Sequence, residues 1–313
     1  MKAFIFPGQG SQKIGMGEEL YNNFIEAKEV FQEVDDALNT NLSNIIFQGT
    51  EKDLKLTANT QPSLMCVSYA IVKVLELMVG KKIFEIGNFV AGHSLGEYSA
   101  LLSVNSFSLA DAARILRLRG KLMQEAVPLG LGSMAALIGA DNEIINIIRD
   151  KYVENDEILD VGNDNSPGQI VISGHKSAVD KVIKNYKELN IKRAIELPVS
   201  APFHCALMRD VAIAMKEPIK NLYLVRPEIS LINNVDADIV DDPEIIKDNL
   251  IRQISATVRW RESIKKMISL GTKDFIELGA GNVLAGLVKR IDTNVNSYSV
   301  ETIDEIENLA NNV

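Results

Sequence analysis

The stretch Val90-Ala91-Gly92-His93-Ser94-Leu95-Gly96-Glu97-Tyr98 joins an apolar run to a helical pattern through a serine flanked by glycines. In this G-x-S-x-G arrangement the serine stands on a sharp turn between a strand and a helix. Glycine suits both flanking positions because a Cβ there would collide with the neighbouring strand or helix. The N–H of Leu95 and the start of the helix would face a developing oxyanion. The pattern predicts a nucleophilic serine, but it also recurs by chance, and the serine could serve only as a helix N-cap.

Apolar runs alternate with helical patterns before and after this stretch. The order predicts an α/β fold in which helices cover both faces of a mostly parallel, α/β-hydrolase-like sheet. The first and last predicted strands end in Gly8-Gln9-Gly10 and Gly279-Ala280-Gly281, where ligands bind in such sheets. A dinucleotide-binding loop is disfavoured because Lys13 stands where its third glycine would fall. Strands are expected at 1–6, 89–91, 229–233 and 274–278, and helices at 17–38, 61–79, 109–126, 206–222, 242–254, 257–270 and 283–291.

The middle of the chain has a different order of predicted strands and helices. After a glycine-rich connection at 128–132, the order is strand, helix, strand, strand, helix, strand, which is that of the split βαβ, ferredoxin-like unit. We therefore expect a ferredoxin-like small subdomain at 128–197, inserted into a large α/β catalytic subdomain formed by 1–127 and 198–313. Its strands are expected at 134–138, 158–162, 169–173 and 193–197, its helices at 142–151 and 176–189, and a turn cluster at 163–168.

Composition and charge disfavour several classes of protein. The net charge of −9 argues against nucleic-acid binding, which needs a dominant basic face. Because no run of about 18 apolar residues is found, no membrane span is expected. The apolar start at 1–7 is expected to be a core strand and not a signal peptide, so the expected compartment is the cytoplasm. Cys66 and Cys205 are too few for a disulfide framework or a thiolate zinc site, and no cluster with metal-ligand spacing is found.

A serine needs a general base within hydrogen-bond reach to act as a nucleophile near neutral pH. The chain contains three histidines. His93 is next to Ser94, and its side chain is expected to point away from the nucleophile and to pack at the edge of the pocket. His175 opens a helix of the small subdomain and is expected on the surface. His204, in a loop between a strand and a helix, is therefore the predicted base.

Five ordered motifs make the chain resemble the malonyl-CoA:acyl-carrier-protein transacylases of type II fatty-acid synthesis. The resemblance extends from Phe4 to about Arg290 and is far more specific than the G-x-S-x-G pattern alone. The motifs are Phe6-Pro7-Gly8-Gln9-Gly10-Ser11-Gln12, Gly92-His93-Ser94-Leu95-Gly96-Glu97-Tyr98, Leu118-Arg119-Gly120 with Met123-Gln124, Asn165-Ser166-Pro167-Gly168-Gln169, and Pro202-Phe203-His204.

The resemblance implies a ping-pong acyl transfer. Ser94 would attack the thioester of malonyl-CoA and carry the malonyl group as an ester, while His204 would take its proton and later activate the phosphopantetheine thiol of the carrier protein. The backbone N–H groups of Gln9 and Leu95 would hold the oxyanion. The Arg119 guanidinium would bind the malonyl carboxylate through its planar fork of donors. No cofactor or metal is implied in this chemistry.

The resemblance also assigns supporting residues. The histidine would be oriented by a backbone carbonyl, that of Gln253, which suits a sequence in which no Asp can be singled out between the serine and the histidine as a third triad member. Phe203 would fill the space that an α-methyl group would occupy and so favour malonyl. Asn165 and His93 would contribute to substrate binding.

The implied macromolecular partner is the acyl carrier protein. Carrier proteins are acidic, so an enzyme with a net negative charge needs a local positive rim near the mouth of its pocket. We expect no nucleic-acid or membrane partner and a protein that acts as a monomer. The candidate rim residues are Lys121, Lys192, Arg193, Lys289 and Arg290.

Two other functions are open on the residues alone. An esterase or thioesterase would share Ser94 and His204, but it normally needs an Asp or Glu after the fifth or a later strand and has no use for Arg119 in the pocket. A non-catalytic binding module with this fold would not need the nucleophile, the base and the arginine together.

Overall fold

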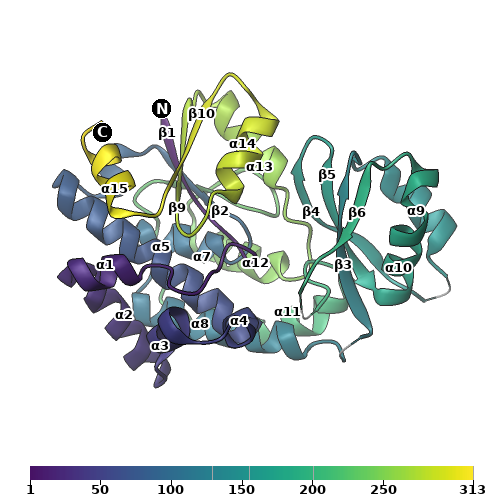
Figure 1. Ribbon diagram of the computed structural model, residues 1–313, viewed down its shortest axis with the longest axis horizontal. Helices are drawn as coiled ribbons and strands as arrows, with labels where there is room; N and C mark the ends of the chain where they lie inside the picture. The colour runs from purple at the N-terminus through teal and green to yellow at the C-terminus, as the bar shows by residue number, and fades with distance from the viewer. Residues whose placement is uncertain (129, 155, 200, 313) are drawn as a thin grey trace.

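The structure is a computed structural model that describes residues 1–128, 130–154, 156–199 and 201–312. Its strands form two separate sheets (Figure 1). Four residues lie outside this description. Residue 129 belongs to the predicted connection at 128–132, and residues 129 and 155 both fall in the small subdomain at 128–197. Residue 200 belongs to the returning loop at 198–204, and residue 313 is the last of the chain. The larger sheet contains, in spatial order, β10 (Asn296–Val300), β9 (Asp274–Leu278), β1 (Lys2–Phe6), β2 (Phe89–Gly92), β7 (Ser230–Ile232) and β8 (Ile239–Val240).

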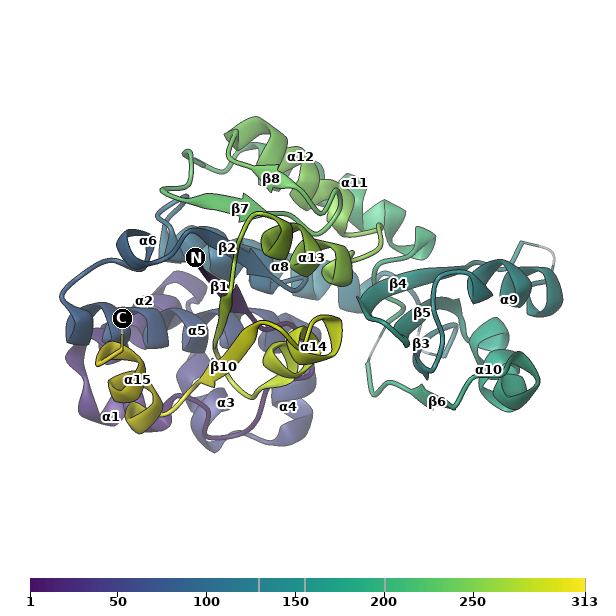
Figure 2. The ribbon, with the colours of Figure 1, turned by 90° about the horizontal axis from the view of Figure 1, so that it is seen from above.

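The larger sheet is mostly parallel, as predicted, with β8 antiparallel to β7 at one edge. Helices cover both of its faces (Figure 2). Alternate residues of β1 belong to two different apolar cores. Phe4 and Phe6 lie in a core that includes residues of α2, α5 and α8, whereas Ala3 and Ile5 lie in a second core with residues of α13 and α14. The helices are α1 (Glu18–Asn23), α2 (Ile25–Leu38), α3 (Leu42–Gln48), α4 (Glu51–Lys55), α5 (Thr57–Val79), α6 (Ile83–Ile86), α7 (Gly96–Ser103), α8 (Leu109–Glu125), α11 (Arg209–Lys220), α12 (Pro243–Gln253), α13 (Trp260–Ser269), α14 (Val283–Ile291) and α15 (Ile303–Ala310).

The smaller sheet is antiparallel and has its own apolar core. Its strands, in spatial order, are β4 (Leu159–Ser166), β5 (Gln169–His175), β3 (Gly132–Ile138) and β6 (Arg193–Glu196). Two helices, α9 (Ile144–Tyr152) and α10 (Lys176–Asn185), pack on the face that lies away from the larger sheet (Figure 2). The fold is therefore mixed α/β, with a mostly parallel sheet and a separate antiparallel one. Short 3-10 helices follow α10 at Tyr186–Leu189 and precede α11 at Ala206–Met208.

The predicted helix at 17–38 is wrong in one respect, because Phe24 separates α1 from α2. The Phe24 backbone is extended, with φ −128° and ψ 129°, and its ring packs on the core. Residues 39–60, for which no element was predicted, form α3, α4 and the first turn of α5. Side-chain caps begin the two short helices: Asn41 accepts from the N–H of Asn44, and Thr50 accepts from that of Asp53. The C-terminal β10 and α15 were also not predicted, whereas the predictions at 109–126, 274–278 and 283–291 agree with α8, β9 and α14 to within one residue.

The predicted turn cluster at 163–168 is also wrong. Residues 163–166 belong to β4, and only Pro167 and Gly168 form the turn. Backbone pairing outside the small sheet explains this extended polar run: the N–H of Asp164 donates to the carbonyl of Val258 at 2.9 Å, and Val258 N–H donates to Gly162 at 2.9 Å. Two bulges in β4 accompany this pairing. The segment after α12 is thereby attached to the small sheet.

The two glycines beside Ser94 allow close backbone contacts. A Cβ on Gly92 would lie 1.9 Å from the carbonyl carbon of Gly96, and a Cβ on Gly96 would lie 2.3 Å from the carbonyl oxygen of Phe6. Both distances are far below any contact that a protein tolerates, and both involve backbone that cannot move independently. Glycine is therefore required at both positions by the packing of α7 against β1 and β2.

We expect Gly92→Ala to lower the free energy of unfolding by about 3 kcal/mol or more, since its Cβ would force backbone apart. Urea denaturation followed by circular dichroism measures this change. Gly286→Ala is the matched control, because no atom lies within 4 Å of its added Cβ and alanine is favoured in a helix interior. Equal unfolding free energies for the two variants would contradict the prediction.

Glu277, at the end of β9, is a buried carboxyl outside the site described below. Its oxygens accept hydrogen bonds from the N–H groups of Leu284 at 3.1 Å and Ala285 at 2.8 Å. Burial raises the pKa of Glu277 to about 7, although these bonds oppose the shift. The folded protein thus keeps a proton that the unfolded chain loses above its ordinary pKa of 4.5. The resulting stabilisation is complete below pH 4.5 and is lost as the pH rises through about 7.

We expect Glu277→Gln to weaken the pH dependence of stability between pH 5 and 8, because glutamine does not titrate. Urea unfolding at several pH values would show the wild-type free energy of unfolding falling more steeply with rising pH than that of the variant. Glu277→Asp, which keeps the titrating group, is the control. Identical slopes for wild type and Glu277→Gln would show that the carboxyl does not titrate in this range.

Among the described helices, α5 is the one long and apolar enough to cross a membrane by length and composition, with a mean hydropathy of 1.6. Two thirds of the relevant window, 67%, is buried inside the protein. Side chains from Leu64 to Leu75 pack in the main core beneath the larger sheet. Burial of this kind is typical of a central core helix, so the apolar composition is weak evidence for a membrane span.

Candidate active site

Ser94 stands on the turn between β2 and α7, as the sequence predicts. Its backbone has φ 55°, in the left-handed region that is unfavourable for a residue with a side chain. Asn234, just after β7, holds this turn: its Oδ1 accepts from the N–H of Ser94 at 2.8 Å, and its Nδ2 donates to the carbonyl of Gly92 at 2.7 Å. The side chain of Asn234 is fully buried. These bonds fix the conformation that presents the serine hydroxyl.

His204 is brought to Ser94 from a distant part of the chain. The distance between Ser94 Oγ and His204 Nε2 is 2.8 Å, and His204 Nδ1 lies 2.8 Å from the carbonyl oxygen of Gln253. Because a carbonyl only accepts, the Nδ1–H donates to it, which leaves Nε2 free to accept from the serine hydroxyl. Burial, followed by the positive charge of Arg119, lowers the pKa of His204 to about 3. The imidazole is therefore neutral at neutral pH and able to take a proton.

Arg119, from α8, is a buried cation beside the serine. It is 1% exposed, and its Nη1 donates to Gln61 Oε1 at 2.8 Å. Its Nη2 donates to Gln253 Oε1 at 2.8 Å and to Ser94 Oγ at 3.2 Å. Burial lowers its pKa, but a guanidinium keeps its charge in proteins. Among the described residues no carboxylate forms an ion pair with it, and none accepts a hydrogen bond from its Nε.

The side chains of Ser94, His204 and Arg119 line a cavity of about 80 Å³. Gln9, Leu95 and Phe203 also line it. This volume suits a small acyl group. The structure thus brings together the expected nucleophile, the expected base, the arginine, both expected oxyanion residues and the expected selectivity residue.

Of His93 and Asn165, both expected to contribute to substrate binding, His93 lines the cavity. Its ring packs at the edge of the pocket, as expected, against Trp260, with ring centroids 5.6 Å apart. Asn165 does not line the cavity, because its Oδ1 accepts from His93 Nε2 at 2.9 Å and the His93 ring occupies the wall. Asn163 lines the cavity instead. His175, expected on the surface, is partly exposed and half-buried; its Nδ1 accepts from the N–H of Ile158.

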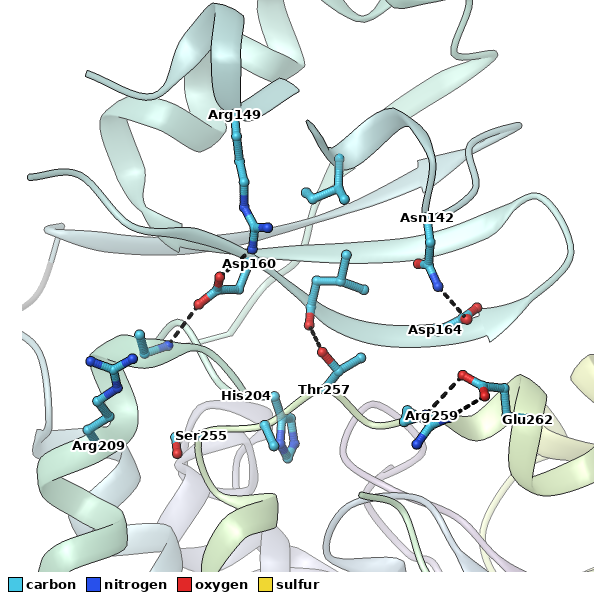
Figure 3. A pocket seen from close by; sticks show the side chains of 14 residues that line it. Asn142, Arg149, Asp160, Asp164, His204, Arg209, Ser255, Thr257, Arg259 and Glu262 are labelled. Carbon is cyan, nitrogen blue, oxygen red and sulfur yellow. Dashed lines mark hydrogen bonds and ion pairs between the residues drawn. The ribbon is translucent and has the colours of Figure 1, made fainter. Parts of the chain in front are cut away.

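A larger cleft of about 520 Å³ reaches His204 from the side of the small sheet. It lies between β4 and the segment that follows α12, with His204 and Thr257 on one side and Asp160 and Asp164 on the other (Figure 3). The Thr257 hydroxyl donates to the carbonyl of Val161 at 2.6 Å, across the two parts of the protein. Charged groups here are largely paired, as in the ion pair of 2.7 Å between Arg261 and buried Asp164. His204 therefore borders both cavities.

Several residues of the site were missed by sequence reasoning. Asn234 follows a predicted strand, so its place at the carboxyl end of that strand was a usable signal. Gln61 lies at the start of a predicted helix, and nothing in the sequence relates it to Arg119. Glu97 was noticed only as part of a motif, yet its carboxyl is fully buried and accepts from Gln253 Nε2 at 2.9 Å. No group of three or more His, Cys, Asp or Glu side chains within the described ranges could hold a metal ion.

Known proteins resemble this chain over nearly its whole length. The model of the acyl transferase domain family matches residues 3–306. Malonyl CoA-acyl carrier protein transacylase of Bacillus subtilis (strain 168) is 44% identical over 308 residues, which cover 97% of this chain and 95% of that protein. The chain belongs to the malonyl-CoA–acyl-carrier-protein transacylase family.

Solved structures of this transacylase family have the same fold throughout. The acyl-carrier-protein-S-malonyltransferase of Bartonella henselae superposes with a TM-score of 0.96 at 47% identity, covering 99% of this chain and 98% of that one. A malonyl-transacylase solved in complex with a type II polyketide acyl-carrier protein has a TM-score of 0.95 at 38% identity, covering 100% and 99%. As a member of the transacylase family, the protein is an acyltransferase.

Proposed function

We propose that this protein transfers the malonyl group from malonyl-CoA to the phosphopantetheine thiol of an acyl carrier protein and so supplies malonyl-carrier for fatty-acid chain elongation. The observation that carries the proposal is Arg119, a buried guanidinium with no carboxylate partner among the described residues, 3.2 Å from Ser94 Oγ. A buried charge is costly unless it is paired. An acyl group that ends in a carboxylate would supply the missing partner while its thioester lies at the serine.

The transfer would proceed in two half-reactions. In the first, Ser94 Oγ forms a bond to the thioester carbonyl carbon, His204 Nε2 takes the hydroxyl proton, and the bond to sulfur breaks as this proton passes to the departing CoA thiolate. In the second, the thiol of the carrier loses its proton to His204, and its sulfur forms a bond to the carbonyl carbon of the malonyl-serine ester. The bond from that carbon to Ser94 Oγ then breaks, and the proton returns from His204 to Oγ. The N–H groups of Gln9 and Leu95 stabilise the oxyanion in both steps.

The proposed base needs no carboxylate beside it. The Gln253 carbonyl fixes the His204 tautomer through the 2.8 Å bond from Nδ1, and the low pKa keeps Nε2 unprotonated. Phe203 restricts the space beside the acyl chain. His93 forms part of the cavity wall, and Asn165 acts on the substrate pocket through its hydrogen bond to His93.

An intact-mass spectrum tests the proposal after brief mixing with malonyl-CoA. Wild-type protein should gain one malonyl group, localised to Ser94, and Ser94→Ala should gain none. Addition of carrier protein should then remove the group from the enzyme and place it on the carrier. An unmodified wild-type protein would overturn the proposal.

A serine hydrolase is the second candidate, since it would use the same Ser94 and His204. It differs in its acceptor, because water and not a thiol would attack the acyl-serine. Release of free malonate without carrier protein, at the rate of transfer measured with it, would favour the hydrolase.

The carrier protein would dock on basic residues near one end of the small sheet. Gln169, Ile138 and Arg193 are aligned across β5, β3 and β6, and Arg290 at the end of α14 donates to Gln169 Oε1. Lys192 adjoins this row, and Lys289 adjoins Arg290. Lys121, the fifth candidate, is on α8 and not part of this row. Within the expected rim, the proposed docking set is therefore Lys192, Arg193, Lys289 and Arg290.

Combined charge reversal, Lys192→Glu with Arg193→Glu, should raise KM for the carrier protein about tenfold and leave KM for malonyl-CoA unchanged, because it removes attraction to an acidic partner. Steady-state kinetics with each substrate varied in turn measures the split. Lys73→Glu on α5, remote from the small sheet, is the control. Equal changes in both KM values would reject this docking site.

We further propose the organisation predicted from sequence: an inserted ferredoxin-like subdomain at 128–197 and a large catalytic subdomain at 1–127 and 198–313, with a hydrolase-like turn at the nucleophile. The order of β3, α9, β4, β5, α10 and β6 and the antiparallel pairing support the first part. We expect the protein to act as a cytoplasmic monomer without a cofactor or metal, since the proposed chemistry needs only its own side chains.

A further inference from the structure

Glu97 is a buried carboxyl that the proposed reaction does not use. It lies in the first turn of α7, three residues after Ser94, and is fully buried. Its Oε2 accepts two hydrogen bonds, from Gln253 Nε2 at 2.9 Å and from the backbone N–H of Asn234 at 3.0 Å. Both donors belong to residues that contact the nucleophile or the arginine. Glu97 is thus one contact away from two parts of the site.

The Gln253 side chain lies between Glu97 and Arg119. Its Nε2 donates to Glu97, and its Oε1 accepts from Arg119 Nη2 at 2.8 Å. The same Nε2 also donates to the Ser94 carbonyl at 3.1 Å and to Asn234 Oδ1 at 3.3 Å, but its bond to Glu97 is the shortest of the three. The guanidinium only donates and these three oxygens accept, so together they determine which end of the amide faces Arg119. The reverse orientation would place an NH₂ group against the guanidinium and a carbonyl against the carboxylate. Without an acceptor at position 97, the amide would lose the shortest of the three bonds that its Nε2 donates, and the remaining acceptors, at 3.1 and 3.3 Å, would hold its orientation less firmly.

The orientation of this amide bears directly on the cation. Arg119 Nη2 is shared between Gln253 Oε1 and Ser94 Oγ, while Nη1 is held by Gln61. The two side-chain oxygens of Gln61 and Gln253 therefore hold the plane of the guanidinium beside the cavity. A fork of donors binds a carboxylate well only when that plane is fixed.

We propose that Glu97 is a positioning residue for the malonyl carboxylate: through the Gln253 amide it sets the direction in which Arg119 presents its donors. This inference rests on the proposed malonyl transfer. It extends that proposal to Glu97, which would affect acyl selectivity through Gln253 and Arg119 without contacting the substrate. Its second bond, to the Asn234 backbone, ties the same carboxyl to the side chain that holds the Ser94 turn.

A positioning role differs from a merely structural one in its effect on selectivity. A substitution that only disordered the turn carrying Ser94 would slow the acylation of Ser94 by every thioester to the same extent. Loss of the Arg119 orientation would slow acylation by malonyl-CoA and spare acetyl-CoA, which has no carboxylate. The informative quantity is therefore the ratio of kcat/KM for serine acylation by malonyl-CoA to that by acetyl-CoA.

The experiment compares wild type with Glu97→Gln, Glu97→Asp and Glu97→Leu by time-resolved intact-mass measurement of acyl-Ser94. Glu97→Gln keeps an oxygen that can accept both bonds, so its ratio should remain within about threefold of wild type. Glu97→Leu removes the acceptor, and Glu97→Asp withdraws it by one methylene. Both should lower the ratio about 10- to 100-fold, the scale expected for misplacement of a substrate-positioning group.

Glu277 provides the matched control, because it too is a fully buried glutamate that accepts two hydrogen bonds. It lies in β9, and its donors are backbone N–H groups in the first turn of α14. Glu277→Leu should lower the midpoint of thermal unfolding and leave the ratio unchanged. The proposal is overturned if Glu97→Leu or Glu97→Asp slows both thioesters equally or leaves the ratio at the wild-type value. If Glu97→Leu does not fold, Glu97→Asp decides. A wild-type protein that is acylated by neither thioester overturns instead the proposed transfer, and this inference with it.

Discussion

His204→Ala is expected to reduce the rate of Ser94 acylation by malonyl-CoA by about 10³-fold or more, a loss typical of removing the base from a serine nucleophile. The reason is the single contact between Ser94 Oγ and His204 Nε2 at 2.8 Å. The Arg119 guanidinium is also at hydrogen-bond distance from Ser94 Oγ, but it cannot accept a proton. Rapid mixing followed by intact-mass measurement gives the rate.

His175→Ala is the matched control for this variant. His175 lies at the junction of β5 and α10, where its ring accepts a backbone hydrogen bond within the small sheet. Its removal should leave the acylation rate within a few-fold of wild type. A His204→Ala protein that acylates at more than about a tenth of the wild-type rate would mean that another group takes the proton.

Arg119→Met is expected to lower kcat/KM for acylation by malonyl-CoA by about 10²- to 10³-fold and to leave acylation by acetyl-CoA nearly unchanged, so that the preference for malonyl is lost. The guanidinium is the proposed charged partner of the malonyl carboxylate, and truncating one member of a buried charged pair costs about 2–5 kcal/mol. Methionine is chosen because it fills much of the same space without charge. The measurement is the acylation rate with each thioester.

Arg119→Lys and Arg114→Met complete the test. Lysine keeps the positive charge but loses the two-donor fork. The kcat/KM of Arg119→Lys for acylation by malonyl-CoA should therefore lie between the values of wild type and Arg119→Met. Arg114, on the same helix, forms an exposed ion pair with Asp111, and its replacement should change neither rate. An undiminished preference for malonyl-CoA in Arg119→Met would show that selectivity arises elsewhere in the cavity.

The parts of the site that sequence predicts best are those encoded locally. The Ser94 turn follows from five consecutive residues, because the close contacts of Gly92 and Gly96 exclude every other side chain there. The proposed pairing of Ser94 with His204 followed from there being only three histidines. The resemblance to the transacylases, now supported by the family comparison, supplied Arg119 and the Gln253 carbonyl.

The parts that sequence predicts poorly depend on tertiary contacts. Nothing local shows that the Gln253 side chain joins Glu97 to Arg119, because these three residues meet only after α7, α8 and α12 have packed together. The polar run at 163–166 has the composition of a turn, and its extended form depends on pairing with Val258, nearly a hundred residues later. The caps of α3 and α4 were detectable, since Asn41 and Thr50 precede short helical segments.

Ser94 and His204 share an unusual backbone conformation, with φ 55° and φ 60° respectively. Glycine adopts this conformation without a steric penalty, and other residues do not. The backbone strain at these two positions therefore lowers the free energy of unfolding, while the strained conformation places the two proposed reacting side chains. Selection for thermal stability alone would favour glycine at both positions, and the resulting protein would be more stable but would lack the two proposed reacting side chains. Thermostability screens of this enzyme therefore need an activity readout to retain these two side chains.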